Sequence, residues 1–159
     1  MNQQARNRHF TSEPYDDQPG YLRLWGGLSD AELSAAARSD PLGFAADHID
    51  IEDREGGAVA VILDDGKAPL TSLIVGGPLD PSPKDCRRAL SPFAMAAGRA
   101  GLPNDPLSIG VVHHRGGPAE VTDLDIRWLE AVTATAKVHG IMVSGVIART
   151  EAGALVRVA

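Results

Sequence analysis

The second half of the chain alternates short apolar runs with turn residues and with longer stretches of helical periodicity. Five apolar runs, each bounded by turn residues such as glycine, aspartate or proline, predict strands, because buried strands are short and rich in Val, Ile and Leu. These runs span residues 58–64, 70–77, 107–114, 141–148 and 154–158. Asp65-Gly66, between the first two runs, is a strong hairpin signal. We expect the first four runs to lie in one sheet, with strand cores at 59–63, 73–75, 109–112 and 141–147.

Two longer segments between these runs carry the start and stop signals of helices. In the first, Ser82 is an N-cap residue, Pro83 suits the first helical position and Asp85 completes a capping box. This helix is expected to run to about Gly101. Ser91-Pro92 predicts a break within it, because proline lacks a backbone N–H donor and strains the preceding turn.

The second long helix begins after Thr122, which forms a capping box with Asp125, and it ends at His139-Gly140. Its apolar spacing predicts a core face made of Ile126, Leu129, Val132 or Thr133, and Ala136. The resulting order of elements, β-β-α-β-α-β-β, predicts an α/β domain over residues 56–159, with a mixed sheet flanked by helices.

The N-terminal part of the chain is expected to form two further regions. Residues 1–20 are polar, contain two prolines and show no periodicity, which predicts a flexible arm. Residues 21–55 predict a short helical segment that packs on the core, with its second helix opened by Pro41. An apolar cluster at the start of this segment is a candidate anchor on the core or at a subunit interface. It consists of Tyr21, Leu22, Leu24 and Trp25.

Composition places the chain among ordinary globular proteins. Its 159 residues are 43% hydrophobic, enough for one domain with a core. The formal net charge of −6 opposes binding to nucleic-acid phosphates, and the basic group Lys84, Arg87 and Arg88 favours a solvated helix face. No stretch has the length and apolarity of a membrane span, and no secretory signal is visible, so we expect a cytoplasmic location. The sole cysteine, Cys86, cannot form an intramolecular disulfide and is expected to pack in the core.

Histidine and aspartate side chains gather around the end of the strand expected at 107–114. His113 and His114 end that strand, and Asp123 and Asp125 follow at the next helix start. Zinc hydrolases need N and O ligands that converge on one ion, with a coordination position open for water. Only one of two adjacent strand histidines can face a given side of the sheet. The alternative role of the aspartates is structural, since both would stabilise a helix N-terminus.

Over residues 58–148 these motifs resemble the RadC-like branch of the JAB/MPN (JAMM) metalloprotease superfamily. The matching pieces are VILDDGK, PKDCRRAL, SIGVVHHRGG and VTDLDIRWLEAVTATAKVHGI. The resemblance implies a JAB/MPN-like α/β fold with cytidine-deaminase-like layering. In that family, zinc is held by the histidines of a His-X-His-Pro motif and by the aspartate of a later Ser-X-X-Asp motif, and an upstream glutamate is the base.

The chain departs from this metal motif at several positions. Aligning Asp125 with the family aspartate puts His114 on the second histidine but Val112 on the first, and Arg115 replaces the proline. A one-residue shift makes His113 the first ligand, but it puts Arg115 on the second histidine and Ile126 on the aspartate. Neither register supplies three ligands.

The remaining family positions depart as well. Thr71 and Ser72 lie where the glutamate is sought, and the Asp-His pair that is usual in the next strand is replaced by about Ser144-Gly145-Val146. Two ligands hold zinc poorly, and without a positioned carboxylate nothing draws the proton from a bound water. The guanidinium of Arg115 repels a dication and offers a salt-bridge partner to Asp123 or Asp125.

We therefore expect a non-catalytic JAB/MPN-like binding or scaffolding module, a pseudo-metallohydrolase without a cofactor. Its partner would be another protein or a second copy of the chain, and Arg115 and the cluster from Tyr21 to Trp25 are the interaction candidates. The alternative is a zinc-dependent hydrolase of the peptidase or isopeptidase type, with His113, His114, Asp123 and Asp125 as an irregular ligand set. A DNA-repair-associated RadC-like protein is a third hypothesis, which the negative charge opposes.

Overall fold

The computed structural model describes residues 30–48, 59–66, 69–75, 77–101 and 104–158. The chain divides into two compact units, Met1–Ala36 and Ala37–Ala159. Helix α3 (Asp30–Ser39) spans this division, which falls inside the N-terminal segment expected at 21–55. The arm expected at 1–20 and the apolar cluster around Trp25 lie outside the described residues.

The second unit is built on one mixed sheet of five strands in the order β2-β1-β3-β4-β5. The strands are β1 (Val59–Asp64), β2 (Pro69–Val75), β3 (Ser108–Arg115), β4 (Met142–Thr150) and β5 (Leu155–Val158). β3 and β4 pair in parallel, and all other neighbours pair antiparallel. The expected mixed sheet flanked by helices is confirmed. The four expected strand cores lie in it, except Ile141, which precedes β4.

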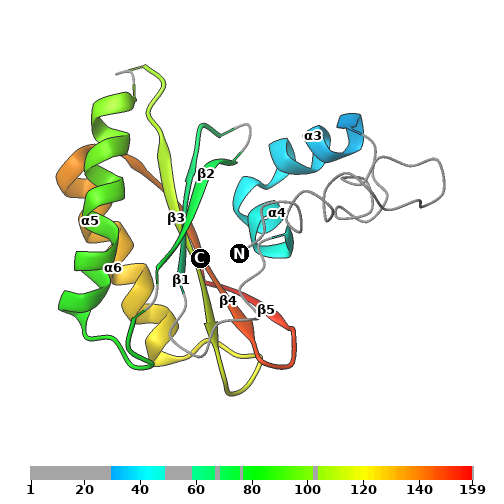
Figure 1. Ribbon diagram of the computed structural model, residues 1–159, viewed down its shortest axis with the longest axis vertical. Coiled ribbons are helices and arrows are strands. Elements are labelled where there is room, and N and C mark those ends of the chain that lie inside the picture. Colours follow the sequence, from blue (N-terminus) through cyan, green and yellow to red (C-terminus); the bar gives the residue numbers. More distant parts are fainter. Residues whose placement is uncertain (1–29, 49–58, 67–68, 76, 102–103, 159) are drawn as a thin grey trace, which may run out of the picture. The chain divides into compact units, whose positions relative to one another are not determined.

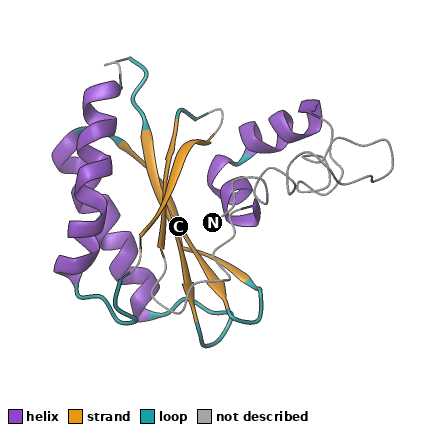
Figure 2. Ribbon diagram, in the orientation of Figure 1, coloured by secondary structure: helices purple, strands orange, loops and turns teal. Residues whose placement is uncertain are grey.

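Helices α5 (Pro83–Ala100) and α6 (Asp123–His139) pack against each other and cover one face of the sheet, as Figures 1 and 2 show. Buried aliphatic side chains fill the space between these helices and the strands. They include Val61, Leu90, Ile109, Val111, Val132 and Val146. Each such side chain stabilises the fold by roughly 1.5–3 kcal/mol when it leaves water.

Helix α4 (Pro41–His48) packs on strands through a separate apolar cluster. The cluster joins Leu42, Ala45 and Ala46 to Ala60, Ile62, Val112 and Ile147. The helix begins where expected, with Pro41 first and with Asp40 Oδ1 accepting a hydrogen bond from Gly43 N at 3.0 Å. Gly110 on β3 permits the close approach of this helix, because a Cβ there would lie 2.8 Å from Leu42 Cδ1.

Helix α5 is continuous through Pro92, so the expected break at this point is wrong. A proline removes one N–H donor but leaves the surrounding helical hydrogen bonds in place. The hydroxyl of Ser91 donates to the carbonyl of Arg87 at 2.7 Å. Within the described residues, no helix is long and apolar enough to cross a membrane.

The buried face of α6 includes Val132 and Ala136, as expected, but differs from the expected face toward the start of the helix. Ile126 is 40% exposed, whereas Trp128 is 5% and Asp125 is 0% exposed. The buried stripe starts at Asp125 and continues through Trp128 to Val132 and Ala136. Apolar spacing alone does not place a charged residue on the core face, but a buried carboxylate is stable when a cation pairs with it.

The carboxyl ends of three strands, β2, β3 and β4, lie at one edge of the sheet. β2 and β3 both pair antiparallel with β1, and β4 pairs parallel with β3, so these three strands run the same way. Their ends lie at the lower side of Figure 1, where α5 and α6 begin. Ligands of open α/β sheets bind outside the carboxyl ends of strands. We therefore expect a functional site at this edge of the sheet.

Candidate functional site

Arg115, the last residue of β3, forms a buried ion pair with Asp125 in the first turn of α6. Arg115 Nε donates to Asp125 Oδ1 and Nη2 donates to Oδ2, both at 2.8 Å. Only 8% of Arg115 and none of Asp125 is exposed. Two parallel charge-assisted hydrogen bonds fix both the distance and the orientation of the groups. The salt bridge expected for Arg115 is thus confirmed, with Asp125 as its partner.

The same guanidinium also holds the loop that joins β3 to α6. Nη1 donates to the carbonyls of Gly116 at 3.0 Å and Pro118 at 2.9 Å, and Nη2 donates to the carbonyl of Glu120 at 2.6 Å. A guanidinium has five N–H donors, so these three bonds and the two to Asp125 use all of them. Arg115 therefore has no donor left for a ligand.

Asp125 also completes half of a capping box with Thr122, the N-cap residue of α6. Asp125 Oδ2 accepts a hydrogen bond from Thr122 N at 2.8 Å. The hydroxyl of Thr122 faces the backbone of Asp125 as in a capping box, but it forms no hydrogen bond of good geometry in the described part of the chain. Burial raises the pKa of Asp125, but the bonds from Arg115 and Thr122 outweigh it and hold the pKa below its usual value.

His113 lies beside the same carboxylate. Its Nε2 is 2.8 Å from Asp125 Oδ1, and Nε2 has no other hydrogen-bond partner among the described residues. The ring centroid is 6.2 Å from that of Trp128. Burial, reinforced by the charge of Arg115, lowers the pKa of His113 to about 4 against the opposing effect of Asp125. His113 is therefore neutral at neutral pH.

The structure places the other two expected ligands apart from this cluster. His114 is partly buried, and strand alternation directs it away from the face that carries His113 and Arg115. Asp123 is exposed at the first position of α6. The histidine that contacts Asp125 is thus His113. His113 is the histidine that serves as first ligand in the alignment shifted by one residue. Among the described residues, no group of three or more His, Cys, Asp or Glu side chains is placed to hold a metal ion.

Two adjoining hollows open at this edge of the sheet. They share Leu79, His114 and Leu124, and the smaller one also reaches His113 and Trp128. The larger has a volume of about 390 Å³, within the range of ligand sites. Its lining residues are Leu79, His114, Arg115, Gly116, Thr122, Leu124 and Glu151. Segments that follow β2, β3 and β4 all contribute to it.

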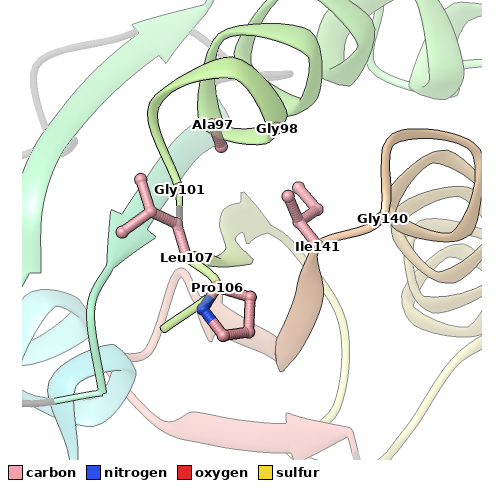
Figure 3. Close-up of a pocket in the computed structure, with 7 residues that line it drawn as sticks. All are labelled: Ala97, Gly98, Gly101, Pro106, Leu107, Gly140 and Ile141. Carbon is pink, nitrogen blue, oxygen red and sulfur yellow. The ribbon is translucent and has the colours of Figure 1, made fainter. Parts of the chain in front are cut away.

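A third hollow, of about 170 Å³, lies between segments at the ends of α5 and α6 (Figure 3). It is lined by Ala97, Gly98, Gly101, Pro106, Leu107, Gly140 and Ile141. None of these side chains can donate or accept a proton. Acid–base chemistry and polar recognition by side chains are therefore confined, among these hollows, to the other edge.

Cys86 packs in the core, as expected. Burial raises the pKa of its thiol to about 11. The thiol is therefore protonated at neutral pH and is a poor nucleophile.

Sequence reasoning missed Leu79 and Glu151 as residues of the site. Neither belongs to a motif, and each follows a different strand. The signal that could have found them is the strand order, because it brings the segments after β2 and β4 next to the end of β3.

No protein-family model, no curated protein and no solved structure matches this chain. The resemblance to JAB/MPN domains therefore rests on the sequence motifs alone.

Proposed function

We propose that the chain is a non-catalytic JAB/MPN-like binding module, in which the ion pair between Arg115 and Asp125 stands where that family holds zinc. The observation that supports this proposal is the full engagement of Asp125. One oxygen accepts from Arg115 Nε, and the other accepts from Arg115 Nη2 and Thr122 N. The residue aligned with the family's metal ligand already binds a cation from its own chain.

A zinc ion at this place would have to displace or share that cation. Separating a buried ion pair leaves an uncompensated charge, which costs about 3–5 kcal/mol. The guanidinium would also repel the dication, because its three hydrogen bonds to the loop carbonyls keep it close to the carboxylate. Arg115 thus acts as an internal substitute for the charge of the metal.

The surroundings of the ion pair favour binding of a partner. The larger hollow opens next to it, and two large apolar side chains nearby are exposed, Leu79 at 74% and Val121 at 49%. Exposed apolar side chains beside a polar hollow are typical of surfaces that bind another molecule. The partner would be a protein or a second copy of the chain.

A zinc hydrolase with irregular ligands is the second candidate. It is favoured by one observation, the distance of 2.8 Å between His113 Nε2 and Asp125 Oδ1. A neutral imidazole next to a carboxylate is a common pair of zinc ligands. This candidate requires Arg115 to move away and further ligands to join.

Zinc content distinguishes the two candidates. The whole chain, purified under gentle conditions and then dialysed against excess zinc, should retain well under one zinc ion per chain. His113→Ala and Asp125→Asn should not change that amount, and His139→Ala serves as a control for adventitious binding at a surface histidine. One zinc ion per chain that is lost in both His113→Ala and Asp125→Asn, but kept in His139→Ala, would establish the hydrolase-type site and refute the binding module.

A further inference from the structure

The solvent side of α5 carries a basic stripe made of Lys84, Arg88 and Arg99. The intervals of four and eleven residues put these side chains on one side of a helix with 3.6 residues per turn. All three are exposed, and the buried residues of α5 lie on the opposite side of the helix. At the rise of an α-helix, Arg88 and Arg99 are about 16 Å apart along its axis.

The cations of this stripe have no acidic partner in the described part of the chain. Arginines outside α5, such as Arg127 and Arg157, form ion pairs with aspartates. Lys84, Arg88 and Arg99 form no ion pair with any described residue. Their charges are therefore available to a partner.

The charge of α5 differs in sign from that of the whole chain. The helix contains four basic residues and one acidic residue, whereas the formal net charge of the chain is −6. The acidic residue, Asp85, is engaged in the capping box with Ser82 and balances at most one of the four cations. The outward side of α5 is therefore positive and attracts an anionic partner.

An apolar side chain lies between the two ends of the basic stripe. Met95 is on the same side of α5 as Arg88 and Arg99, and 42% of it is exposed. Pro92, one turn before it, is exposed as well. Protein–protein interfaces combine an apolar centre with a charged rim, and methionine adapts its shape to the partner. The outward side of α5 has this layout.

This layout fits an acidic protein segment better than a nucleic acid or a membrane. Phe93, the only aromatic residue of α5, packs against the core, so the stripe has no exposed ring on which a base could stack. The net charge of the chain opposes binding to a phosphate backbone. A single exposed methionine provides too little apolar area to hold the chain on a lipid surface.

We propose that the solvent side of α5 binds an acidic helical segment of a partner protein. Carboxylates of the partner pair with Lys84 and Arg88 at one end and with Arg99 at the other. An apolar side chain between these carboxylates packs on Met95. The inference goes beyond the proposed function, because none of these four residues lines the hollows at the carboxyl edge.

The test measures binding of the full chain to a fluorescein-labelled, alanine-rich helical peptide by fluorescence anisotropy. The peptide carries glutamates near both ends, about 11 residues apart, and leucine in the centre. One control peptide has glutamine in place of each glutamate. A second has the same composition, with the leucines at the ends and the glutamates in the centre.

The acidic peptide should bind with a Kd of about 10–100 µM at about 20 mM salt. Each control peptide should bind at least about fivefold more weakly, because it lacks the carboxylates or misplaces them. Raising the salt concentration to about 0.5 M should weaken the acidic peptide about tenfold, since exposed charges are screened.

Variants of exposed arginines localise the binding. Arg88→Gln and Arg99→Gln should each weaken the acidic peptide about threefold, and the double variant about tenfold. Arg38→Gln is the matched control, because Arg38 is exposed on α3 and forms no ion pair with a described residue. It should leave the affinity unchanged. All these variants should keep the urea midpoint of the native chain, because the substituted side chains are exposed and unpaired.

Several results would overturn the inference. They are equal affinity for the acidic peptide and either control peptide, an unchanged affinity in the double variant, or no binding at about 1 mM peptide. Tighter binding of oligothymidylate of about 20 nucleotides, or of phosphatidylserine vesicles, would assign the stripe to another class of partner. None of these results bears on the zinc experiment, which tests the buried ion pair at the carboxyl edge.

Discussion

Arg115 and Asp125 are joined by two hydrogen bonds of 2.8 Å across the end of β3 and the start of α6. The pair connects the sheet to the helix layer, and through Arg115 it also holds the loop between them. A cation fixed within the chain thus stabilises the place where the sequence motifs resemble a metal site. This relationship has consequences for stability, pH dependence and metal binding.

Removing Arg115 should destabilise the chain strongly. Arg115→Met leaves the Asp125 carboxylate buried without its cation and frees three loop carbonyls, so we expect a loss of about 3–5 kcal/mol in urea unfolding. Arg127→Met is the matched control, because Arg127 pairs with the exposed Asp80. It should change the unfolding midpoint little. A similar small loss in both variants would show that the buried pair does not hold the fold.

Acid should weaken the fold through His113. Its pKa is about 4 in the folded chain and 6.5 in the unfolded chain, so the unfolded state binds the proton first as the pH falls. Stability should therefore decrease between pH 6.5 and 4, by about 3 kcal/mol at most. His113→Gln should flatten the profile of unfolding free energy in this range, whereas His139→Gln should leave it unchanged. An unaltered slope in His113→Gln would mean that His113 is not held neutral by burial.

The two capping boxes should respond differently to mutation. Ser82 exchanges hydrogen bonds with Asp85 in both directions, at 3.0 Å and 3.1 Å, so Ser82→Ala should cost about 1 kcal/mol. The hydroxyl of Thr122 forms no hydrogen bond of good geometry with any described residue, so Thr122→Val should cost less than about 0.5 kcal/mol. Thermal unfolding of the two variants tests this difference. A larger loss for Thr122→Val would mean that its hydroxyl caps α6 in solution.

At Asp64, the last residue of β1, a neutral side chain should give a fold at least as stable as the native carboxylate does. Burial raises its pKa despite the hydrogen bond from Gly66 N and the nearby hydroxyl of Ser144, and its Oδ2 has no well-formed partner among the described residues. Asp64→Asn keeps the acceptor for Gly66 N and adds an N–H donor facing Ser144. We expect the variant to be at least as stable as the native chain at pH 7.

The advantage of Asp64→Asn should shrink as the pH falls toward 3.8, the ordinary pKa of an aspartate, because the native carboxyl is then protonated in both states. Asp47→Asn on the exposed side of α4 is the control and should show no such pH-dependent gain. If the native chain were more stable than Asp64→Asn at pH 7, the buried charge of Asp64 would not destabilise the fold, and the prediction would be wrong.

The strands and helices were predictable because each is specified by neighbouring residues. The apolar run at 58–64 and the turn at Asp65-Gly66 are local signals, and they formed the β1–β2 hairpin. The continuous helix through Pro92 was not predictable from the same signals. A single missing donor breaks an isolated helix more readily than one packed on a sheet and a second helix.

The site was less predictable, because its contacts join residues far apart in the chain. The two readings of the metal motif differ by one position, and such a shift moves every strand side chain to the other face. Only the fold shows that His113 and Arg115 share the face of Asp125. Glu151 lines the same hollow as His114 because β3 and β4 pair in parallel. No local sequence pattern predicts this pairing.

The most direct measurement is the unfolding free energy of the native chain in the presence of a chelator and in the presence of zinc. A ligand that binds only the folded state stabilises it by about 2.7 kcal/mol at a concentration of 100 times its Kd. If Arg115 replaces the charge of the metal, the urea midpoint should be the same with EDTA and with saturating zinc. A midpoint that falls in EDTA and is restored by one equivalent of zinc would contradict the proposal that the ion pair of Arg115 and Asp125 occupies this place.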